Sequence, residues 1–201
     1  MGDALQIGRR QPSFGLRAYA GWVAASAAAV LLGMAFIYLF IFVAKAIIPG
    51  VNEDRLMGRS LFLILGAFIG AGQWLLLRGR VPHSGWRVVA TAAGLWLGTT
   101  IGFRAVGMQL PVHQRDLLLA GATVGFCLGL AQLLILRPGW RRSLIWLLAS
   151  ALGWLCLTAV IGESLDRTSD LVALGAIPAA FTGLALAWGY GWRGEAAAES
   201  E

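Results

Sequence analysis

Six long apolar runs, separated by short polar segments, divide the chain. A helix needs about 20 mostly apolar residues to cross the hydrocarbon core of a bilayer, and each run is close to that length. The pattern therefore predicts an all-α integral membrane protein with about six transmembrane helices in a tightly packed bundle. The expected spans are Trp22–Ile47, Ser60–Leu77, Arg87–Phe103, Asp116–Leu136, Ser143–Ile161 and Asp170–Tyr190.

The third run is the shortest, and its ends depend on where the charged side chains of Arg87 and Arg104 reach toward the membrane surface. The first run, about 20–48, is longer than the roughly 7–15 residues of a signal-peptide core, so we expect a retained transmembrane helix. The expected domains are a cytoplasmic tail at 1–19, a transmembrane domain at 20–192 and a cytoplasmic tail at 193–201.

A two-helix hairpin is written twice along the chain. Gly66-x3-Gly70-x-Gly72-Gln73-Trp74-x3-Arg78 recurs 59 residues later as Gly125-x3-Gly129-x-Ala131-Gln132-Leu133-x3-Arg137. The copies cover about 61–103 and 120–162, and both enter from the same side of the membrane. We therefore expect a parallel internal repeat, related by an axis along the membrane normal. A weaker third echo lies in the last helix, where Ala187-Trp188 precedes Arg193.

The doubled hairpin, with Ala90-Thr91 and Gly94 matched by Ala149-Ser150 and Gly153, resembles uncharacterised multi-pass membrane proteins of bacteria, many of them phototrophs. The similarity covers about 66–162, half of the chain. The second copy departs from it by Leu133 in place of the tryptophan and by a shorter loop that contains Pro138. The resemblance implies a six-helix or similar bundle and assigns no activity, cofactor or site residue.

Small residues recur at every fourth position in five of the six expected helices. Such stripes remove side-chain bulk from one face, so that two helix backbones approach closely in the membrane. The same stripes are also compatible with a path for a solute, because glycine exposes backbone carbonyl groups. We expect helix packing at Gly66, Gly70, Gly94, Gly98, Gly102, Gly121, Gly125, Gly129, Gly153 and Gly183.

Gln73 and Gln132 are the most specific polar residues of the expected spans. Each lies five positions before an arginine at the end of its helix, and therefore about 7 Å deeper at about 1.5 Å per residue. An amide at that depth requires a hydrogen-bond partner. One interpretation is a bond to a backbone carbonyl or to the glutamine of the other repeat, and the alternative is contact with a ligand or an ion.

Composition supports the membrane assignment and predicts an orientation. Apolar residues make up 58% of the chain and charged residues 13%, and the mean hydropathy is +0.73. The net charge of +6 comes from short loops, ten of 16 basic residues lying on the side of both termini, so it indicates topology rather than nucleic-acid binding. We expect a bacterial inner-membrane protein with both termini cytoplasmic. Seven tryptophans fall near that boundary and are expected in its headgroup layer: Trp22, Trp74, Trp86, Trp140, Trp146, Trp188 and Trp192.

Chemistry-bearing residues are few within the spans. His83 and His113 fall in loops, so the commonest axial ligand of haem or chlorophyll is missing from the expected membrane interior, and a bound lipid or pigment would be held by shape. Cys127 and Cys156 are expected to behave as small apolar residues, with a disulfide between helices as the alternative. The acidic residues at the outer ends of the last two helices predict a solvated loop rather than an ion site: Glu163, Asp166 and Asp170.

Two functional hypotheses remain open. The sequence contains no catalytic motif and no metal-ligand spacing, so we expect a protein that is not an enzyme. The first hypothesis is an integral subunit that packs against other membrane proteins and stabilises a larger complex, photosynthetic or respiratory if the organism is a phototroph. The alternative is a small transporter or channel in which Gln73 and Gln132 form a polar contact about the repeat axis.

Overall fold

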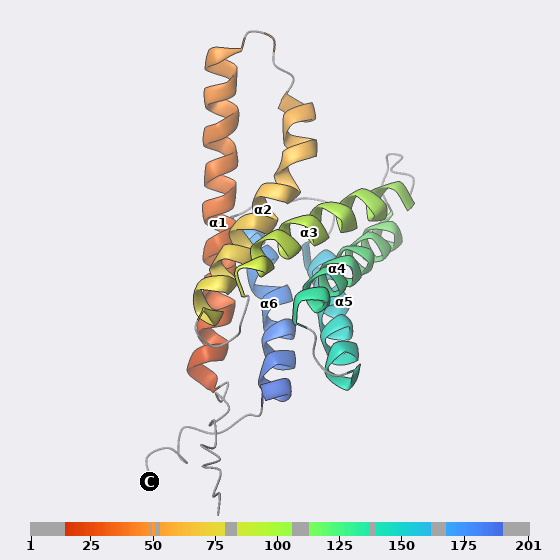
Figure 1. The fold of residues 1–201 in the computed structure, drawn as a ribbon. Helices are drawn as coiled ribbons and strands as arrows, with labels where there is room; N and C mark the ends of the chain where they lie inside the picture. Colours follow the sequence, from red (N-terminus) through yellow and green to blue (C-terminus); the bar gives the residue numbers. More distant parts are fainter. Residues whose placement is uncertain are drawn as a thin grey trace, which may run out of the picture.

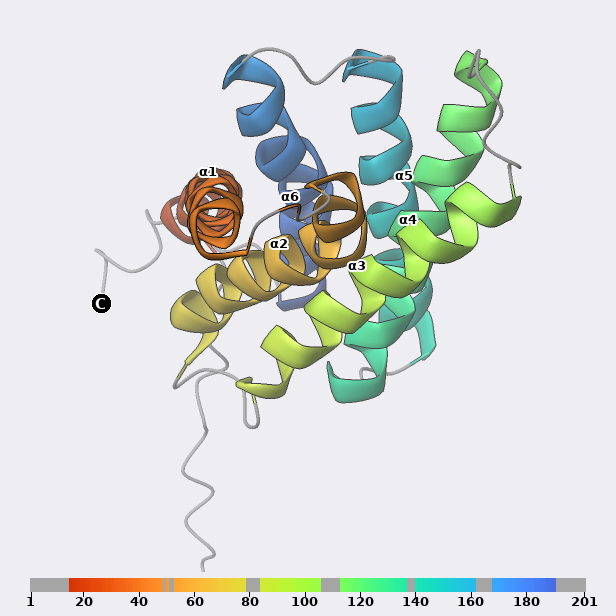
Figure 2. The same ribbon diagram turned by 90° about the horizontal axis from the view of Figure 1, so that it is seen from above.

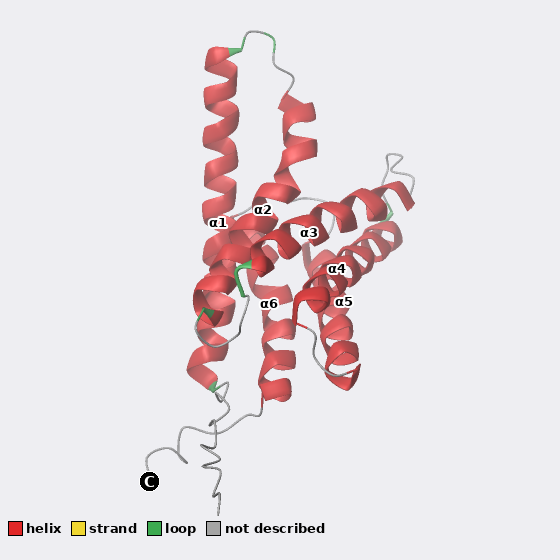
Figure 3. Cartoon of the chain, in the orientation of Figure 1, coloured by secondary structure: helices red, strands yellow, loops and turns green. Residues whose placement is uncertain are grey.

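The computed structural model describes residues 15–48, 50, 53–78, 84–105, 113–136, 140–161 and 168–190, with side chains from 60 in the third of these ranges, to 134 in the fifth and to 188 in the last. This part of the chain forms six helices and no strand (Figure 3). All six are long and apolar enough to cross a bilayer. They are α1 (Leu16–Ile47), α2 (Glu53–Leu77), α3 (Trp86–Ala105), α4 (Gln114–Leu136), α5 (Trp140–Ile161) and α6 (Thr168–Tyr190).

The predicted six-helix membrane bundle is confirmed, and the helices are longer than the predicted spans. α1 begins six residues earlier than expected and reaches 32 residues, and α2 begins at Glu53 rather than Ser60. The extra turns carry Arg17, Glu53 and Asp54, which apolar runs exclude by definition. Hydropathy locates the lipid-crossing part of each helix, whereas backbone hydrogen bonding continues into the polar flanks.

The helices form a closed ring. Each helix packs mainly against the next one in the sequence, and α6 packs against α1 to complete the circle. Figure 2 shows this arrangement from above, and Figure 1 shows that α1 and the first turns of α2 stand beyond the ends of the other helices. We refer to the end where α1 begins and α6 ends as the terminal end of the bundle.

The same close contact recurs in three helix pairs. A Cβ atom added to Gly66 of α2 would lie 2.6 Å from the Cα atom of Ala92 in α3. The equivalent atom on Gly125 of α4 would lie 2.8 Å from Ala151 Cα in α5, and that on Gly175 of α6 would lie 2.6 Å from Ala27 Cα in α1. α2–α3, α4–α5 and α6–α1 are therefore equivalent hairpins around an approximate threefold axis.

The third hairpin is assembled from the two ends of the chain. Gly175 meets Ser26 and Ala27 as Gly66 meets Thr91 and Ala92. This register differs from the third echo suggested by the sequence, which aligned Ala187 with Gly72 and relied on Arg193, a residue outside the described part of the chain. α6 therefore corresponds to α2 and α4, the first helices of the two repeats. The helix that corresponds to α3 and α5 is α1, not a segment that follows α6.

Small residues face the next helix around the whole ring. Gly33 of α1 faces α2, Gly70 of α2 faces α3, and Gly153 of α5 faces α6. Backbone or side-chain atoms of the neighbour lie within 3.1 Å of the added Cβ at each of these positions. Direct backbone approach of this kind replaces the hydrophobic drive that lipid cannot supply. The remaining members of the stripes are Gly94, Gly98 and Gly102 against α4, Gly121, Gly125 and Gly129 against α5, and Gly183 against α1.

We predict that Gly66→Ala destabilises the bundle although alanine is the better helix former. The new methyl group would meet the Ala92 backbone, which cannot move independently of α3. Overpacking of this kind costs about 1–3 kcal/mol, and it should lower the free energy of unfolding in detergent. Gly21→Ala is the matched control, because the nearest atom to its added Cβ lies 3.9 Å away. Equal stability of the two variants would contradict the packing argument.

Candidate functional site on the bundle axis

Three small hydroxyl residues lie at equivalent positions of the three hairpins. They are Ser26 in α1, Thr91 in α3 and Ser150 in α5. The backbone of each lies against the closely packed glycine of the paired helix. Their exposed fractions are 1%, 0% and 0%. The small side chains are required there because each backbone approaches a glycine of the paired helix. The same contact directs three hydroxyl groups into the interior of the ring.

The two glutamines belong to a second set of equivalent positions. Gln73 lies seven residues after Gly66, Gln132 seven after Gly125, and Thr182 seven after Gly175. The Gln132 Nε2 atom donates to Gln73 Oε1 at 3.4 Å and to Thr91 Oγ1 at 3.0 Å. Of the alternatives that the sequence left open, the structure shows the bond between the two repeats. Both glutamines are buried, so the amides contact protein rather than lipid.

Thr182 completes this layer from α6. Its Oγ1 atom donates to the carbonyl oxygen of Pro178 at 2.9 Å and accepts a hydrogen bond from Trp22 Nε1 at 3.3 Å. Pro178 lies inside α6, where its ring removes one backbone donor. Gly153 of α5 provides the room for this proline, since its added Cβ would lie 2.9 Å from Pro178 Cα.

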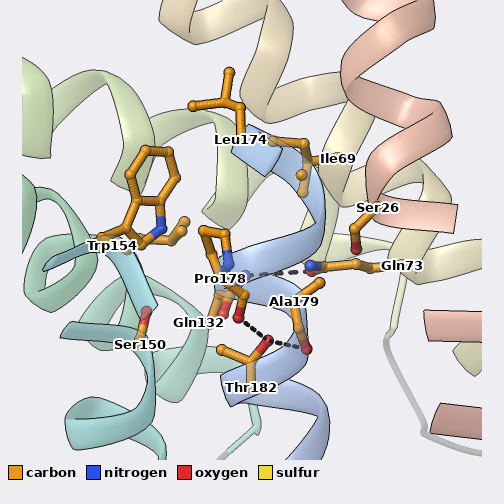
Figure 4. A pocket seen from close by; sticks show the side chains of 12 residues that line it. Ser26, Ile69, Gln73, Gln132, Ser150, Trp154, Leu174, Pro178, Ala179 and Thr182 are labelled. Carbon is orange, nitrogen blue, oxygen red and sulfur yellow. Dashed lines mark hydrogen bonds between the residues drawn. The ribbon is translucent and has the colours of Figure 1, made fainter. Parts of the chain in front are cut away.

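These side chains surround a cavity of about 20 Å³ on the axis (Figure 4). Ser26 and Gln73 lie on one side of it in the figure, and Ser150 and Trp154 lie on the other. A cavity of this size has room for about one ordered water, and it is partly open rather than enclosed. Apolar clusters lie toward both ends of the bundle, one around Val30 and the other around Leu186.

Several polar atoms around the axis have no hydrogen-bond partner among the described residues. They are Ser26 Oγ, Ser150 Oγ, Trp154 Nε1 and Trp146 Nε1. The first three belong to residues that line the cavity. Buried polar groups are nearly always paired with protein, water or a ligand, because an unpaired group costs about 1–3 kcal/mol. Ser26, Ser150 and Trp154 are therefore the polar groups at the cavity wall that the described residues leave without a partner.

A buried arginine occupies the next layer toward the terminal end. Arg87 lies four residues before Thr91, as Trp146 lies four before Ser150 and Trp22 four before Ser26. The Arg87 Cζ atom is 5.3 Å from the centroid of each of the two indole rings, and its exposed fraction is 0%. Cation–π attraction is strongest where water is excluded. A permanent positive charge thus lies inside the bundle, between two aromatic rings.

This position corrects two expectations from the sequence. Arg87 was expected to reach the membrane surface from the end of a span. It is the second residue of α3, and its side chain is fully buried inside the bundle. Trp22 and Trp146 were expected in the headgroup layer, but both are buried and contact Arg87. Trp86, Trp140 and Trp188 are more than 60% exposed, as a membrane-boundary position requires. The overlooked signal is the 59-residue offset, which aligns Arg87 with Trp146.

Other candidate residues lie away from the axis. Cys127 and Cys156 are free thiols, so the disulfide alternative is wrong. Asp170 lies in the first turn of α6, far along the helix from Thr182, whereas His83, Glu163 and Asp166 lie outside the described residues. Within the described ranges no three His, Cys, Asp or Glu side chains gather into a metal-binding group.

The axis brings together several kinds of polar group. Its hydroxyl, amide, indole and guanidinium groups keep one protonation state around neutral pH, so they act through hydrogen bonds and charge. No protein-family model, no curated protein and no solved structure matches this chain. The fold and the axis define a multi-pass helical membrane protein, and its function is inferred from the geometry alone.

We predict that Gln132→Leu is more destabilising than Gln73→Leu. The Gln132 amide donates two hydrogen bonds, one to Gln73 and one to Thr91. Gln73 takes part only in the longer of the two among these contacts. Loss of interhelical hydrogen bonds should lower the free energy of unfolding by about 1 kcal/mol for Gln132 and by roughly half of that for Gln73. Thr100→Val is the control, because its hydroxyl bonds the carbonyl oxygen of Trp96 in its own helix. The reverse order would contradict the assigned network.

We also predict strong energetic coupling between Arg87 and Trp146. A double-mutant cycle of Arg87→Met and Trp146→Leu should give about 2 kcal/mol in unfolding experiments, because the pair is desolvated. Arg141 and Trp140 form a matched control: the Arg141 Cζ atom also lies 5.3 Å from the ring centroid, but the Trp140 ring is 74% exposed. The equivalent cycle there should give less than about 1 kcal/mol. Similar coupling in both pairs would show that burial does not strengthen the contact.

Proposed function

We propose that the protein is a non-catalytic integral subunit that assembles with, or stabilises, a larger complex in the bacterial inner membrane. Both termini face the cytoplasm in this proposal, and the complex is photosynthetic or respiratory if the organism is a phototroph. The observation that carries the proposal is the set of exposed aromatic side chains in the second half of α1. Figure 1 shows that α1 stands beyond the other helices. The small volume of the cavity between the helices supports the proposal.

α1 exceeds the length that crossing the membrane requires. Its 32 residues correspond to about 48 Å at about 1.5 Å per residue, whereas the hydrocarbon core is about 30 Å thick. The buried residues of its second half, Gly33, Ile37 and Ile41, form one narrow stripe. Large apolar side chains cover the remaining surface, with Phe42 72% exposed and Tyr38 58% exposed. This surface exceeds what the six-helix ring itself can bury.

Aromatic side chains suit a protein interface within the membrane. They bury a large area with few rotatable bonds, and they are enriched in the cores of protein interfaces. The exposed aromatic side chains of α1 lie on the two sides of its buried stripe, with Phe36 and Phe40 on one side and Tyr38 and Phe42 on the other. Phe36 already contacts Phe68 of α2, since their ring centroids are 5.6 Å apart. A partner helix laid against Tyr38 and Phe42 would add contacts that lipid tails supply less well. We therefore assign this face of the second half of α1 as the docking element of the proposed subunit.

A small transporter or channel is the second candidate function. It is supported by the cavity that both Gln73 and Gln132 line and by the buried charge of Arg87. Ionisable residues inside membranes often mark the path of a substrate or an ion. The volume of about 20 Å³ favours the subunit role, because conduction requires the ring to open.

We predict that the protein purified from its native membrane in a mild detergent migrates as a complex larger than its own 21.4 kDa. Tyr38→Ala with Phe42→Ala should release the partners, because these two rings share one exposed face of α1. Leu148→Ala with Leu152→Ala on α5 is the control, since those side chains are similarly exposed and lie on another helix. Native gels and mass spectrometry of the purified particle provide the measurement.

Two results would decide against the subunit role. A monodisperse monomer with detergent and no co-purifying protein would remove it. Solute flux into liposomes that contain the purified protein alone would establish the transporter instead. Retention of the complex in the α1 double variant would leave the subunit role but show that docking occurs elsewhere.

A further inference from the structure

Pro178 interrupts the backbone hydrogen bonds of α6 at the wall of the cavity. Proline has no N–H, so the carbonyl oxygen of Leu174, four residues earlier, lacks the donor that a regular helix would supply. Leu174 and Pro178 both line the cavity, so the missing bond lies on the face of α6 that the cavity borders. In a membrane, a carbonyl freed by proline is satisfied by a neighbouring helix, a hydroxyl side chain or an ordered water.

α5 presents two polar side chains to the same part of the cavity. Ser150 and Trp154 lie four residues apart, so their Cβ atoms are about 5–6 Å apart on one face of α5. Both residues line the cavity, and Figure 4 shows them on the same side of Pro178. The Ser150 Oγ and Trp154 Nε1 atoms are buried and have no hydrogen-bond partner in the part of the chain that the structure describes. An indole N–H, which only donates, and a hydroxyl, which donates and accepts, therefore line the same space as Leu174.

Backbone contact between α5 and α6 fixes the two polar side chains beside the proline. Gly153 lies three residues after Ser150 and directly before Trp154. A Cβ atom added to Gly153 would lie 2.9 Å from the Cα atom and 3.4 Å from the carbonyl oxygen of Pro178. The backbone of α5 thus rests on α6 at the proline, and Ser150 and Trp154 flank this contact.

The mixture of donors and acceptors selects a neutral ligand that can do both. An anion would be repelled by the carbonyl oxygen of Leu174, and a cation would be repelled by the indole N–H of Trp154. An apolar occupant such as an acyl chain would leave these groups and the Ser150 hydroxyl unpaired, which is unfavourable inside a membrane. Water donates and accepts, and the volume of about 20 Å³ exceeds the roughly 10–15 Å³ that an ordered water requires.

We propose that an ordered water binds between α5 and α6 at Pro178. It accepts a hydrogen bond from Trp154 Nε1 and donates one to the carbonyl oxygen of Leu174, and Ser150 Oγ is its third partner. The water replaces the backbone bond that Pro178 removes from α6 by a bridge to α5. This site goes beyond the proposed function, since it holds whether the protein acts as a subunit or as a transporter.

Removal of the Ser150 hydroxyl tests for the water by the sign of the effect. Ser150→Ala in the full-length protein in detergent should lower the melting temperature by about 2–4 °C, because a water-mediated hydrogen bond is lost. Without a bound water, the variant would remove a buried hydroxyl that has no partner, and an unchanged or higher melting temperature would overturn the proposal. Thr99→Val is the control, since the Thr99 hydroxyl is also buried but donates to the carbonyl oxygen of Leu95 in its own helix at 2.9 Å. It should change the melting temperature by less than about 1 °C.

A double-mutant cycle with Pro178→Ala tests the bridge to α6. This variant restores a backbone N–H at position 178, which can bond the Leu174 carbonyl, so the water loses one of its three partners. In the Pro178→Ala background, Ser150→Ala should therefore lower the melting temperature by roughly half as much as in the wild type, or less. Strictly additive shifts would overturn the bridge. The same cycle with Thr99→Val in place of Ser150→Ala should be additive.

Direct observation completes the test without relying on a variant. A crystal of the full-length protein, diffracting well enough to show ordered waters, should contain a density peak within hydrogen-bond distance of both Trp154 Nε1 and the Leu174 carbonyl oxygen. A lipid or detergent chain in this space would overturn the proposal, as would a direct hydrogen bond from Trp154 Nε1 to a protein acceptor.

Discussion

Direct contact between helix backbones is the constraint on which the rest of this molecule depends. Lipid tails are as apolar as leucine, so the helices gain little from burying apolar side chains against one another. Gly66, Gly125 and Gly175 instead let each helix rest on the backbone of its partner. At these contacts the residue that faces the glycine is small, as Ser26, Thr91 and Ser150 are. The polar axis, the small cavity and the enclosed arginine all follow from this close approach.

Differences between the three hairpins matter as much as their similarity. The layer of Arg87 contains one guanidinium and two indoles at equivalent positions. Three arginines there would repel one another in a medium of low dielectric constant, whereas two aromatic faces attract a single cation from both sides. The glutamine layer is likewise uneven, because Thr182 replaces the third amide and bonds within its own helix. The approximate threefold symmetry places three side chains at each level of the axis. The differences between those side chains give each level its charge and its hydrogen bonds.

Hydropathy and the doubled motif were enough to predict the spans and the all-helical fold, because these features repeat along the chain. They left the bond between Gln73 and Gln132 as one of several alternatives, and only the structure selects it. The third hairpin escaped prediction, since a comparison of successive segments cannot detect a unit divided between the first and last helices. The position of Arg87 was predicted wrongly, because a charged residue next to a loop usually lies at the membrane surface. Only the closure of the ring by α1 and α6 brings Trp22 of α1 and Trp146 of α5 against the Arg87 side chain.

The division of one hairpin between the chain ends imposes an order on biosynthesis. The α2–α3 and α4–α5 hairpins can close as soon as their own residues enter the membrane. Of the six described helices, α1 is made before the others but waits for α6, since Trp22 and its hydrogen-bond partner Thr182 are separated by 160 positions. During that interval the Trp22 indole and the Ser26 hydroxyl of α1 have not yet met α6. Among these six helices, α6 is therefore the one whose insertion closes the ring.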